Sequence, residues 1–236
     1  CGADRIIGLA ATGTGGRVVA ELLGAAFVNE VVAQATATGR LHPEVRTIIE
    51  IGGEDSKLIF LRPSTTTGEL EVADFAMNAI CAAGTGSFLD QQASRLGLTI
   101  EEFGEMAMQS VSPPRVAGRC SVFAKSGMIN LQQKATPTED IVAGLCYALV
   151  RNFKSTVGSA ATLELPVSFQ GGVAANRGIV RAIREVLELE GEQLIIPEHF
   201  AAMGAIGAVL AAGAGLPAVD WGRLRELSEY VAQGAE

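Results

Sequence analysis

The stretch of sequence that decides the fold runs from residue 46 to residue 76 and reads RTIIEIGGEDSKLIFLRPSTTTGELEVADFA. Residues 46–51 are rich in apolar, β-branched side chains, and after a pair of glycines residues 56–61 follow at the distance of a hairpin. The turn cluster PSTTTG then leads into residues 69–76, where polar and apolar side chains alternate. The pattern predicts a three-stranded antiparallel meander.

Downstream of this meander, helical and strand patterns alternate. Two helices are predicted from their start signals. Thr99 with Glu102 forms a capping box, and a later helix has Thr136 as its N-cap, Pro137 in first position and Glu139 completing the box. The other predicted helices and strands are helices at 87–96, 120–133, 175–190 and 200–212, and strands at 167–170 and 194–196.

From residue 46 the order of elements is therefore β-β-β-α, a helical insert at about 98–160, and then β-α-β-α. This order predicts one α/β unit over residues 46–212, built on a five-stranded mixed sheet. Before it, residues 5–9 and 26–29 have strand patterns, each followed by a helical pattern. Because two strands do not form a stable sheet alone, we interpret residues 1–45 as part of a larger element.

The composition limits the class of protein. The chain has 236 residues, and its 18 basic and 26 acidic side chains give a net charge of −8. With 48% hydrophobic and 19% charged residues it can bury a real core, which excludes intrinsic disorder. Nucleic acids and anionic membranes bind clustered Lys and Arg, so the acidic balance argues against both. Four scattered cysteines without a CxxC pair indicate an intracellular, cytoplasmic protein.

One stretch, residues 200–219, carries no charge and has to be tested as a membrane span. Glycines and a proline follow its helix-compatible part, residues 200–212, whose length is ~20 Å at 1.5 Å per residue. A bilayer core needs about 30 Å, so we expect a packed helix of a soluble protein. Residues 213–236 are predicted to contain a C-terminal helix, which Asp220 caps and which extends to about Val231.

Three glycine-rich turns follow strands or precede helices, and they are the strongest binding signals in the chain. They are Gly52-Gly53 with Glu54 and Asp55, Gly84-Thr85-Gly86, and Gly171-Gly172 with Asn176. Such turns let backbone N–H groups approach a phosphate, and a helix N-terminus adds a favourable dipole. Each turn taken alone also fits an ordinary tight turn. The three together favour nucleotide binding.

Two cysteines stand at the start of predicted helices. Cys81 precedes the Gly84 turn and Cys120 opens the helix at 120–133, where the positive helix end would stabilise a thiolate. An iron–sulfur cluster of four irons takes four ligands, so one chain supplies half a site and a symmetric dimer would supply the rest. Taken alone, the residues favour buried or incidental thiols over a cluster site. Cys146 lies on an apolar helix face and is expected in the core.

Six motifs in order give the chain a family resemblance: IGGEDSKLI, NAICAAGTGSFLDQQASRLG, RCSVFAKSGMINL, EDIVAGLCYALVRN, FQGGVAANRGIVRA and PEHFAAMGAIGAVLA. Together they resemble the BadF/BadG/BcrA/BcrD-type ATPases, which include the activators of 2-hydroxyacyl-CoA dehydratases and the ATPase subunits of benzoyl-CoA reductase. The resemblance implies an actin/Hsp70/sugar-kinase fold, with two RNase H-like halves and ATP between them. Residues 1–45 would then be a remnant of the first half, truncated at its N-terminus, and residues 46–212 the second half.

The resemblance also implies cofactors and partners. ATP or ADP with Mg²⁺ would bind between the halves, and a [4Fe-4S] cluster would be held across a homodimer by Cys81 and Cys120 of each subunit. The cluster would pass a low-potential electron, received from a ferredoxin or flavodoxin, to a dehydratase or reductase that acts on a CoA thioester. No nucleic acid or membrane partner is implied.

Residue by residue, Gly52, Gly53, Glu54 and Asp55 match the family's second phosphate loop. The remaining matched positions of the nucleotide site are Gly84, Thr85, Gly86, Gly171, Gly172, Asn176 and Gly204. Glu30, Glu50 and Asp55 are the candidate catalytic carboxylates. Glu30 would position water or magnesium, although a glutamate at the start of a helix is also favoured by the helix dipole alone.

Several positions depart from the family pattern. The loop DxGSxxxK, with which family members begin, has no counterpart here, so we expect the chain to begin inside the first half. Glu50 stands where Asp is usual, Glu54 where Gln is common, and Lys125 where an acidic residue is usual. Two other interpretations stay open: an ATP-binding kinase-like domain without a cluster, and a non-catalytic regulatory or assembly module. The missing loop and Glu50 favour the second of these.

Overall fold

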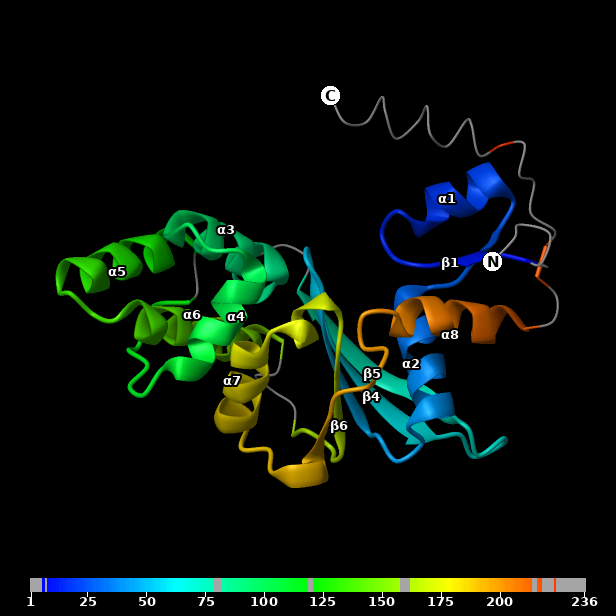
Figure 1. Cartoon of the computed structure of the whole chain (residues 1–236). Helices are drawn as coiled ribbons and strands as arrows, with labels where there is room; N and C mark the ends of the chain where they lie inside the picture. Colours follow the sequence, from blue (N-terminus) through cyan, green and yellow to red (C-terminus); the bar gives the residue numbers. More distant parts are fainter. Residues whose placement is uncertain are drawn as a thin grey trace. The chain divides into compact units, whose positions relative to one another are not determined.

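The computed structural model describes residues 6, 8–78, 82–118, 121–157, 162–213, 216–217 and 223. The chain divides into two compact units, each built from segments that are distant in the sequence. Unit 1 comprises Cys1–Glu44, Arg62–Val72 and Ala202–Glu236, and unit 2 comprises Val45–Leu61 and Ala73–Ala201. Figure 1 shows the helices and strands of both units, with labels where there is room.

A five-stranded mixed sheet is the centre of the fold, and its strand order is β5-β4-β3-β6-β7. Strand β3 pairs with β4 in antiparallel fashion, Ile49 opposite Leu58, and with β6 in parallel fashion, Ile49 opposite Phe169. The predicted five-stranded mixed sheet is therefore confirmed. The strand bounds are β3 Thr47–Ile51, β4 Ser56–Pro63, β5 Leu70–Asn78, β6 Val167–Gln170 and β7 Leu194–Ile195.

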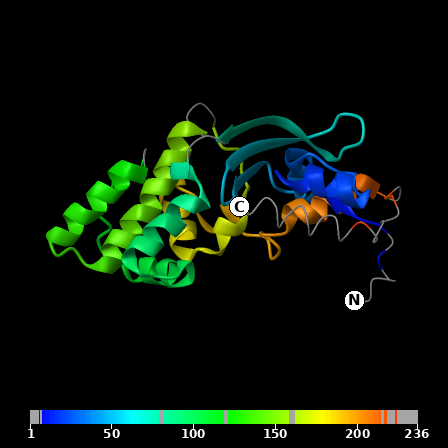
Figure 2. The ribbon, with the colours of Figure 1, turned by 90° about the horizontal axis from the view of Figure 1, so that it is seen from above.

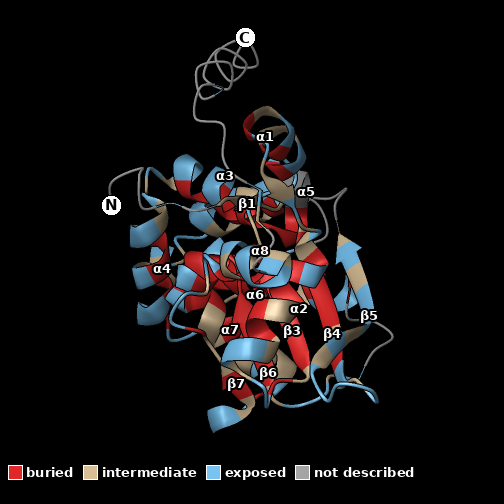
Figure 3. Ribbon diagram, turned by 90° about the vertical axis from the view of Figure 1, so that its right-hand side faces the viewer, coloured by how far each residue is buried: buried red, intermediate tan, exposed pale blue. Residues whose placement is uncertain are grey.

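Strands β3 and β6 are buried along their whole length, as their red colour in Figure 3 shows. Strands covered on both faces need nearly continuous apolar side chains, which explains the run of isoleucines in β3. Helices α3 to α7 gather on one side of the strands (Figures 1 and 2). Their bounds are α3 Gly86–Leu96, α4 Ile100–Gln109, α5 Ser121–Gln133, α6 Thr138–Thr156 and α7 Arg177–Leu187, with short 3₁₀ turns at Ala82–Gly84, Gly172–Ala175 and Gly191–Gln193.

The centre of this helical layer is α6, which packs against α4, α5 and α7. Every residue from Ile141 to Val150 is buried, so α6 is enclosed on all sides rather than along a single apolar face. The capping box predicted at Thr136 is wrong, because Pro137 is the N-cap and no side chain caps the helix. The backbone N–H of Thr136 instead donates to the carbonyl of Leu131 at 3.0 Å, which places Thr136 in the turn that closes α5.

The capping box of α4 is confirmed. The backbone N–H of Glu102 donates to Thr99 Oγ1 at 3.2 Å, and that of Thr99 donates to Glu102 Oε2 at 2.8 Å. These two bonds satisfy two N–H groups that a helix start would otherwise leave without a partner. They fix the first turn of α4, which becomes one wall of the candidate site.

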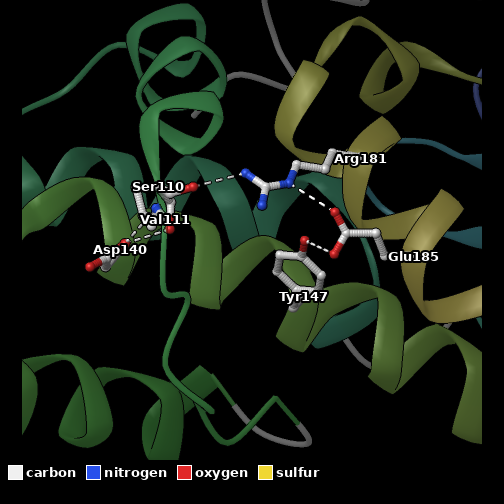
Figure 4. Close-up of polar contacts among 6 residues, drawn as sticks. All are labelled: Ser110, Val111, Asp140, Tyr147, Arg181 and Glu185. Atoms are coloured by element: carbon white, nitrogen blue, oxygen red, sulfur yellow. Dashed lines mark hydrogen bonds and ion pairs between the residues drawn. The ribbon is translucent and has the colours of Figure 1, made fainter.

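A polar network joins α6, α7 and the segment after α4 (Figure 4). The hydroxyl of Tyr147 donates to Glu185 Oε2 at 2.5 Å, and Arg181 Nε donates to Glu185 Oε1 at 3.0 Å. Arg181 Nη1 also donates to the backbone carbonyl of Ser110. The hydroxyl of Ser110 in turn donates to Asp140 Oδ1 at 2.6 Å. These bonds connect three elements that meet only through folding.

Unit 1 has a small parallel pair of strands, β1 Ala10–Ala11 and β2 Ala26–Phe27, with helix α1 Gly16–Leu23 between them. The strand predicted at 5–9 is displaced, since β1 begins at Ala10; Arg5 and Ile7 lie outside the described residues. The strand predicted at residues 26–29 corresponds to β2.

Helices α2 Glu30–Leu41 and α8 Met203–Ala212 make the main contact of unit 1. A Cβ atom at Gly207 would lie 1.7 Å from the carbonyl oxygen of Ala33, so only glycine allows this approach. The prediction grouped α8 with residues 46–212, whereas the structure groups it with α2. In the part of the chain that the structure describes, no helix is long and apolar enough to cross a membrane.

Candidate functional site

The three glycine-rich turns meet at one cavity of unit 2, which we call the glycine cavity. Its volume is about 430 Å³. From the sequence, Gly53, Gly86, Gly172 and Asn176 were predicted to belong to a common site, and all four line it. The other lining residues are Leu89, Asp90, Ile100, Glu101, Gly104, Glu105, Val173, Ala175 and Arg177.

Backbone hydrogen bonds hold the first two turns together. The N–H of Gly86 donates to the carbonyl of Gly52 at 2.8 Å, and the N–H of Ser87 donates to the carbonyl of Gly53 at 2.9 Å. The hydroxyl of Ser87 donates to the same carbonyl at 2.6 Å. The start of α3 therefore anchors the β3–β4 turn, and these two N–H groups are already used within the protein.

The third turn needs glycine for two different reasons. Gly171 has φ +89°, and a Cβ there would lie 2.3 Å from the carbonyl oxygen of Ile51, so this residue is required by the fold. At Gly172 and at Gly53 a Cβ would meet nothing within 4 Å. These two glycines line the cavity without any packing need for glycine, which is expected where a ligand comes close to the backbone.

Asn176 combines a structural bond with an unused donor. Its Oδ1 accepts from the N–H of Ile179 at 3.1 Å and so caps α7. Its Nδ2 has no hydrogen-bond partner, and the residue is buried, with only 7% of its surface exposed. A Cβ at Gly104 would lie 3.2 Å from the Asn176 amide, so the glycine in α4 makes room for this side chain. A buried donor without a partner is costly unless a ligand or a water accepts from it.

Charged side chains from α3, α4 and the start of α7 complete the cavity. Arg177 pairs with Glu105 at 3.1 Å, and both side chains are largely exposed. Asp90 and Glu101 add two more carboxylates. Sequence reasoning missed the whole contribution of α4; the signal that pointed to it was Gly104 in the middle of an otherwise amphipathic helix.

Two of the candidate catalytic carboxylates, Glu50 and Asp55, share a cation that sequence reasoning missed. Lys57 Nζ donates to Glu50 Oε2 at 3.0 Å and to Asp55 Oδ1 at 2.6 Å. The Lys57 side chain is 2% exposed. An inward lysine in an otherwise apolar strand was the available signal, because a buried lysine needs a paired carboxylate.

The remaining predicted residues lie around this core or in unit 1. Glu54 is exposed on the β3–β4 turn and does not line the cavity, and Thr85 is the buried N-cap residue of α3. Glu30 is the first residue of α2 in unit 1. Gly204, also in unit 1, packs in α8, and a Cβ there would lie 3.3 Å from Gln34 Nε2. Gly84 lies in the 3₁₀ turn before α3.

Cys81 and Cys120 lie outside the described residues, but their neighbours in sequence converge. A Cβ at Gly84, three residues after Cys81, would lie 3.4 Å from Asn152 Nδ2 on α6. Asn152 also lines a second cavity, together with Gly118 and Phe123 on either side of Cys120. Both flanking segments therefore meet α6 at the same side chain. Cys146 is fully buried, and burial raises the pKa of its thiol to about 12, which keeps it protonated.

The architecture defines the class of protein. A xylulose kinase from Brucella ovis superposes with a TM-score of 0.50 at 17% sequence identity, covering 81% of this chain and 44% of the kinase chain. The fold is thus that of the actin-like ATPases and sugar kinases, as predicted.

The model of the BadF/BadG/BcrA/BcrD ATPase family matches residues 3–212, so the chain belongs to that family. The 2-hydroxyisocaproyl-CoA dehydratase activator of Clostridioides difficile is 36% identical over 183 residues, which cover 78% of this chain and 65% of the relative. The (R)-2-hydroxyglutaryl-CoA dehydratase activating ATPase of Acidaminococcus fermentans is 32% identical over 178 residues, or 75% of this chain and 66% of the relative. The chain thus spans just under two thirds of these curated relatives.

Solved structures agree with these matches. The activator of the 2-hydroxyisocaproyl-CoA dehydratase from Clostridium difficile, with bound ADPNP, has a TM-score of 0.78 at 33% identity and covers 90% of this chain and 75% of its own. Component A of the Acidaminococcus fermentans (R)-2-hydroxyglutaryl-CoA dehydratase has a TM-score of 0.77 at 30% identity, over 88% of this chain and 76% of its own.

Proposed function

We propose that this chain is the nucleotide-binding part of an ATP-dependent activator that delivers a low-potential electron to a dehydratase or reductase acting on a CoA thioester. The observation that carries the nucleotide assignment is the meeting of the three glycine-rich turns at one cavity, with the unused donor of Asn176 in its wall. The names of the two relatives, both activators of CoA-thioester dehydratases, support the activator role.

In this proposal Gly53 and Gly172 leave room for the nucleotide, and Asn176 Nδ2 donates to an acceptor on it. The base and the sugar hydroxyl groups of the nucleotide can donate to three carboxylates of the cavity, those of Asp90, Glu101 and Glu105. These carboxylates would repel phosphate, so we place the phosphate groups beside the glycine turns. Glu50 and Asp55, with their charge partly neutralised by Lys57, are the carboxylates of unit 2 that would act on Mg²⁺ or on the attacking water. Glu30 of unit 1 is proposed for the same chemistry.

The second part of the proposal is a [4Fe-4S] cluster held by Cys81 and Cys120 of two subunits. Two arguments support the fit: the segments that flank the two cysteines both meet Asn152, and Cys146 stays a thiol. When bound, the cluster would take one electron from a ferredoxin or flavodoxin and give it to the partner enzyme. In sequence, Cys81 comes directly before the 3₁₀ turn at Ala82–Gly84 and Cys120 directly before α5, and the start of a helix would favour the negative charge of a thiolate there. A homodimer follows because one chain supplies two of the four ligands.

The test is an anaerobic iron and acid-labile sulfide assay on the chain, combined with its mass in solution. We expect four irons per dimer in the wild type, and loss of the iron and of the dimer in Cys81→Ser and in Cys120→Ser. Cys146→Ser is the matched control and is expected to keep its iron. ADP binding without iron in all four proteins would contradict the cluster and favour a kinase-like ATP-binding domain.

A further inference from the structure

The second cavity of unit 2 has a charge pattern that the proposed function does not use. Its volume is about 590 Å³, and it shares no lining residue with the glycine cavity. Among the residues that the structure describes, its charged lining residues are Arg115 and Arg151, and none of its lining residues is a carboxylate. In a chain of net charge −8, a cavity lined by two guanidinium groups and no acidic side chain is a local reversal of sign. We call it the arginine cavity.

We propose that the arginine cavity binds a phosphate dianion, either free or as the end group of a phosphate monoester, through Arg115, Arg151 and Asn152. A guanidinium presents planar paired donors that match two phosphate oxygens at once, and two of them can neutralise a dianion. The site is distinct from the nucleotide site. It adjoins the region proposed for the cluster, since the segments that flank Cys81 and Cys120 also meet Asn152, but phosphate binding requires no cluster.

Unused donors support this assignment. Nη2 of Arg151 is buried and has no hydrogen-bond partner, and Nδ2 of Asn152 is in the same situation. Within the described part of the chain, Arg115 forms no ion pair or hydrogen bond. The described lining of the cavity therefore offers three sets of donors and no acidic acceptor, the reverse of a site built for a cation. Leaving such donors without a partner is costly, and an oxyanion would satisfy them.

The positive charges of Arg115 and Arg151 also repel each other. Burial lowers the pKa of Arg151, and the positive charge of Arg115 lowers it further. The guanidinium of Arg151 lies 5.9 Å from the centre of the Tyr147 ring, a contact that orients it without neutralising it. An anion between the two groups would turn this repulsion into attraction.

The backbone keeps Arg115 in place beside α6. A Cβ at Gly118 would lie 2.4 Å from the carbonyl oxygen of Ala148, and one at Gly144 would lie 2.6 Å from that of Pro114. The segment that carries Arg115 is thus pressed against α6, the helix that carries Arg151 and Asn152. A site whose donors are held in position before binding loses little conformational entropy when the ligand arrives.

The test is calorimetric titration of the whole chain with inorganic phosphate, with saturating ADP present to fill the glycine cavity. We expect measurable binding that weakens with salt and falls at least tenfold in Arg115→Gln and in Arg151→Gln. Arg115 is exposed, so its variant should fold normally. Arg151→Lys keeps the charge but loses the paired donors, and is expected to lie between the wild type and Arg151→Gln. Arg62→Gln, an exposed arginine paired with Glu71, is the matched control and should bind like the wild type.

A second titration uses O-phosphoserine to separate the two sources of phosphate. Binding of both probes assigns a monoester, and binding of phosphate alone assigns the free ion. Equal affinity of the wild type and Arg115→Gln for phosphate, or no binding of either probe, would overturn the proposal. Because no assay of iron or of nucleotide is involved, this failure would leave the proposed function untouched.

Discussion

Lys57 donates a hydrogen bond from Nζ to Glu50 Oε2 over 3.0 Å, and the two side chains are 2% and 6% exposed. Removing one partner of such a pair leaves a charge in the interior without compensation, which typically destabilises by about 3–5 kcal/mol. We therefore expect Lys57→Met to lower the free energy of unfolding by about that amount in a urea titration.

The control for this prediction is the double variant Lys57→Met with Glu50→Gln. Because the amide carries no charge, it should recover part of the lost stability. A double variant no more stable than Lys57→Met would contradict the idea that the buried charge of Glu50 is the cause.

Gly172 and its neighbour Gly171 should separate binding from folding. We expect Gly172→Asp to abolish detectable ADP and ATP binding in calorimetry, because the new carboxylate would lie where the nucleotide comes close, while the unfolding midpoint stays nearly unchanged. Gly171→Ala should instead lower the midpoint of unfolding, because Gly171 has φ +89° and a Cβ there would clash with the carbonyl oxygen of Ile51. Unchanged nucleotide affinity in Gly172→Asp would remove this turn from the site.

Asn176 allows its two roles to be tested with two substitutions. Asn176→Asp keeps an oxygen that accepts from Ile179 but loses the Nδ2 donor, so stability should hold while nucleotide affinity falls about tenfold or more. Asn176→Ala loses the helix cap as well and should also be about 1 kcal/mol less stable. Equal affinities of wild type and Asn176→Asp would show that Nδ2 does not touch the nucleotide.

The Tyr147–Glu185 bond makes stability depend on pH in a defined window. Burial, followed by the hydrogen bond to Glu185, raises the pKa of Tyr147 from 10.0 to about 12, so the folded state holds this proton more tightly than the unfolded state. The hydrogen bond from Tyr147 lowers the pKa of Glu185 below 4.5. The stabilisation from the Tyr147–Glu185 hydrogen bond is therefore present between pH 4.5 and pH 10. It is lost as pH rises from 10 to 12 or falls below 4.5.

Accordingly, Tyr147→Phe should be less stable than the wild type by about 1–2 kcal/mol at neutral pH. The difference between the two proteins should shrink at both ends of the window when unfolding is followed across pH. A difference that stays constant from pH 9 to pH 12 would rule out the tyrosine proton as its source.

Much of the fold could be predicted because the local patterns agree with the tertiary structure. The isoleucines of β3 and the capping box at Thr99 each depend on neighbours in sequence. The errors came from competition between neighbouring elements. Thr136 has the composition of an N-cap, but its N–H is used by the carbonyl of Leu131 in the preceding turn. Sequence alone does not reveal that prior bond.

The glycines that line the glycine cavity could be recognised in the sequence, whereas the lining residues contributed by packing between helices could not. The turn patterns in the sequence identify Gly53, Gly86 and Gly172. The turns of Gly53 and Gly172 come together because β3 and β6 are neighbours in the sheet. The wall supplied by α4 depends on how that helix packs against α7, which no local pattern encodes. Lys57 was missed because its partners are recognised only when all three side chains are seen buried together.

The contact between α2 and α8 has a consequence for the order of synthesis. Helix α2 leaves the ribosome early, yet its partner α8 is among the last described elements to be made, and all of unit 2 is translated between them. A nascent chain that ends before Ala202 contains every residue of unit 2, while Ala33 still lacks the glycine against which it will pack. All of unit 2 can therefore be synthesised before the contact between α2 and α8 can form, so unit 1 is the last of the two units that can be completed.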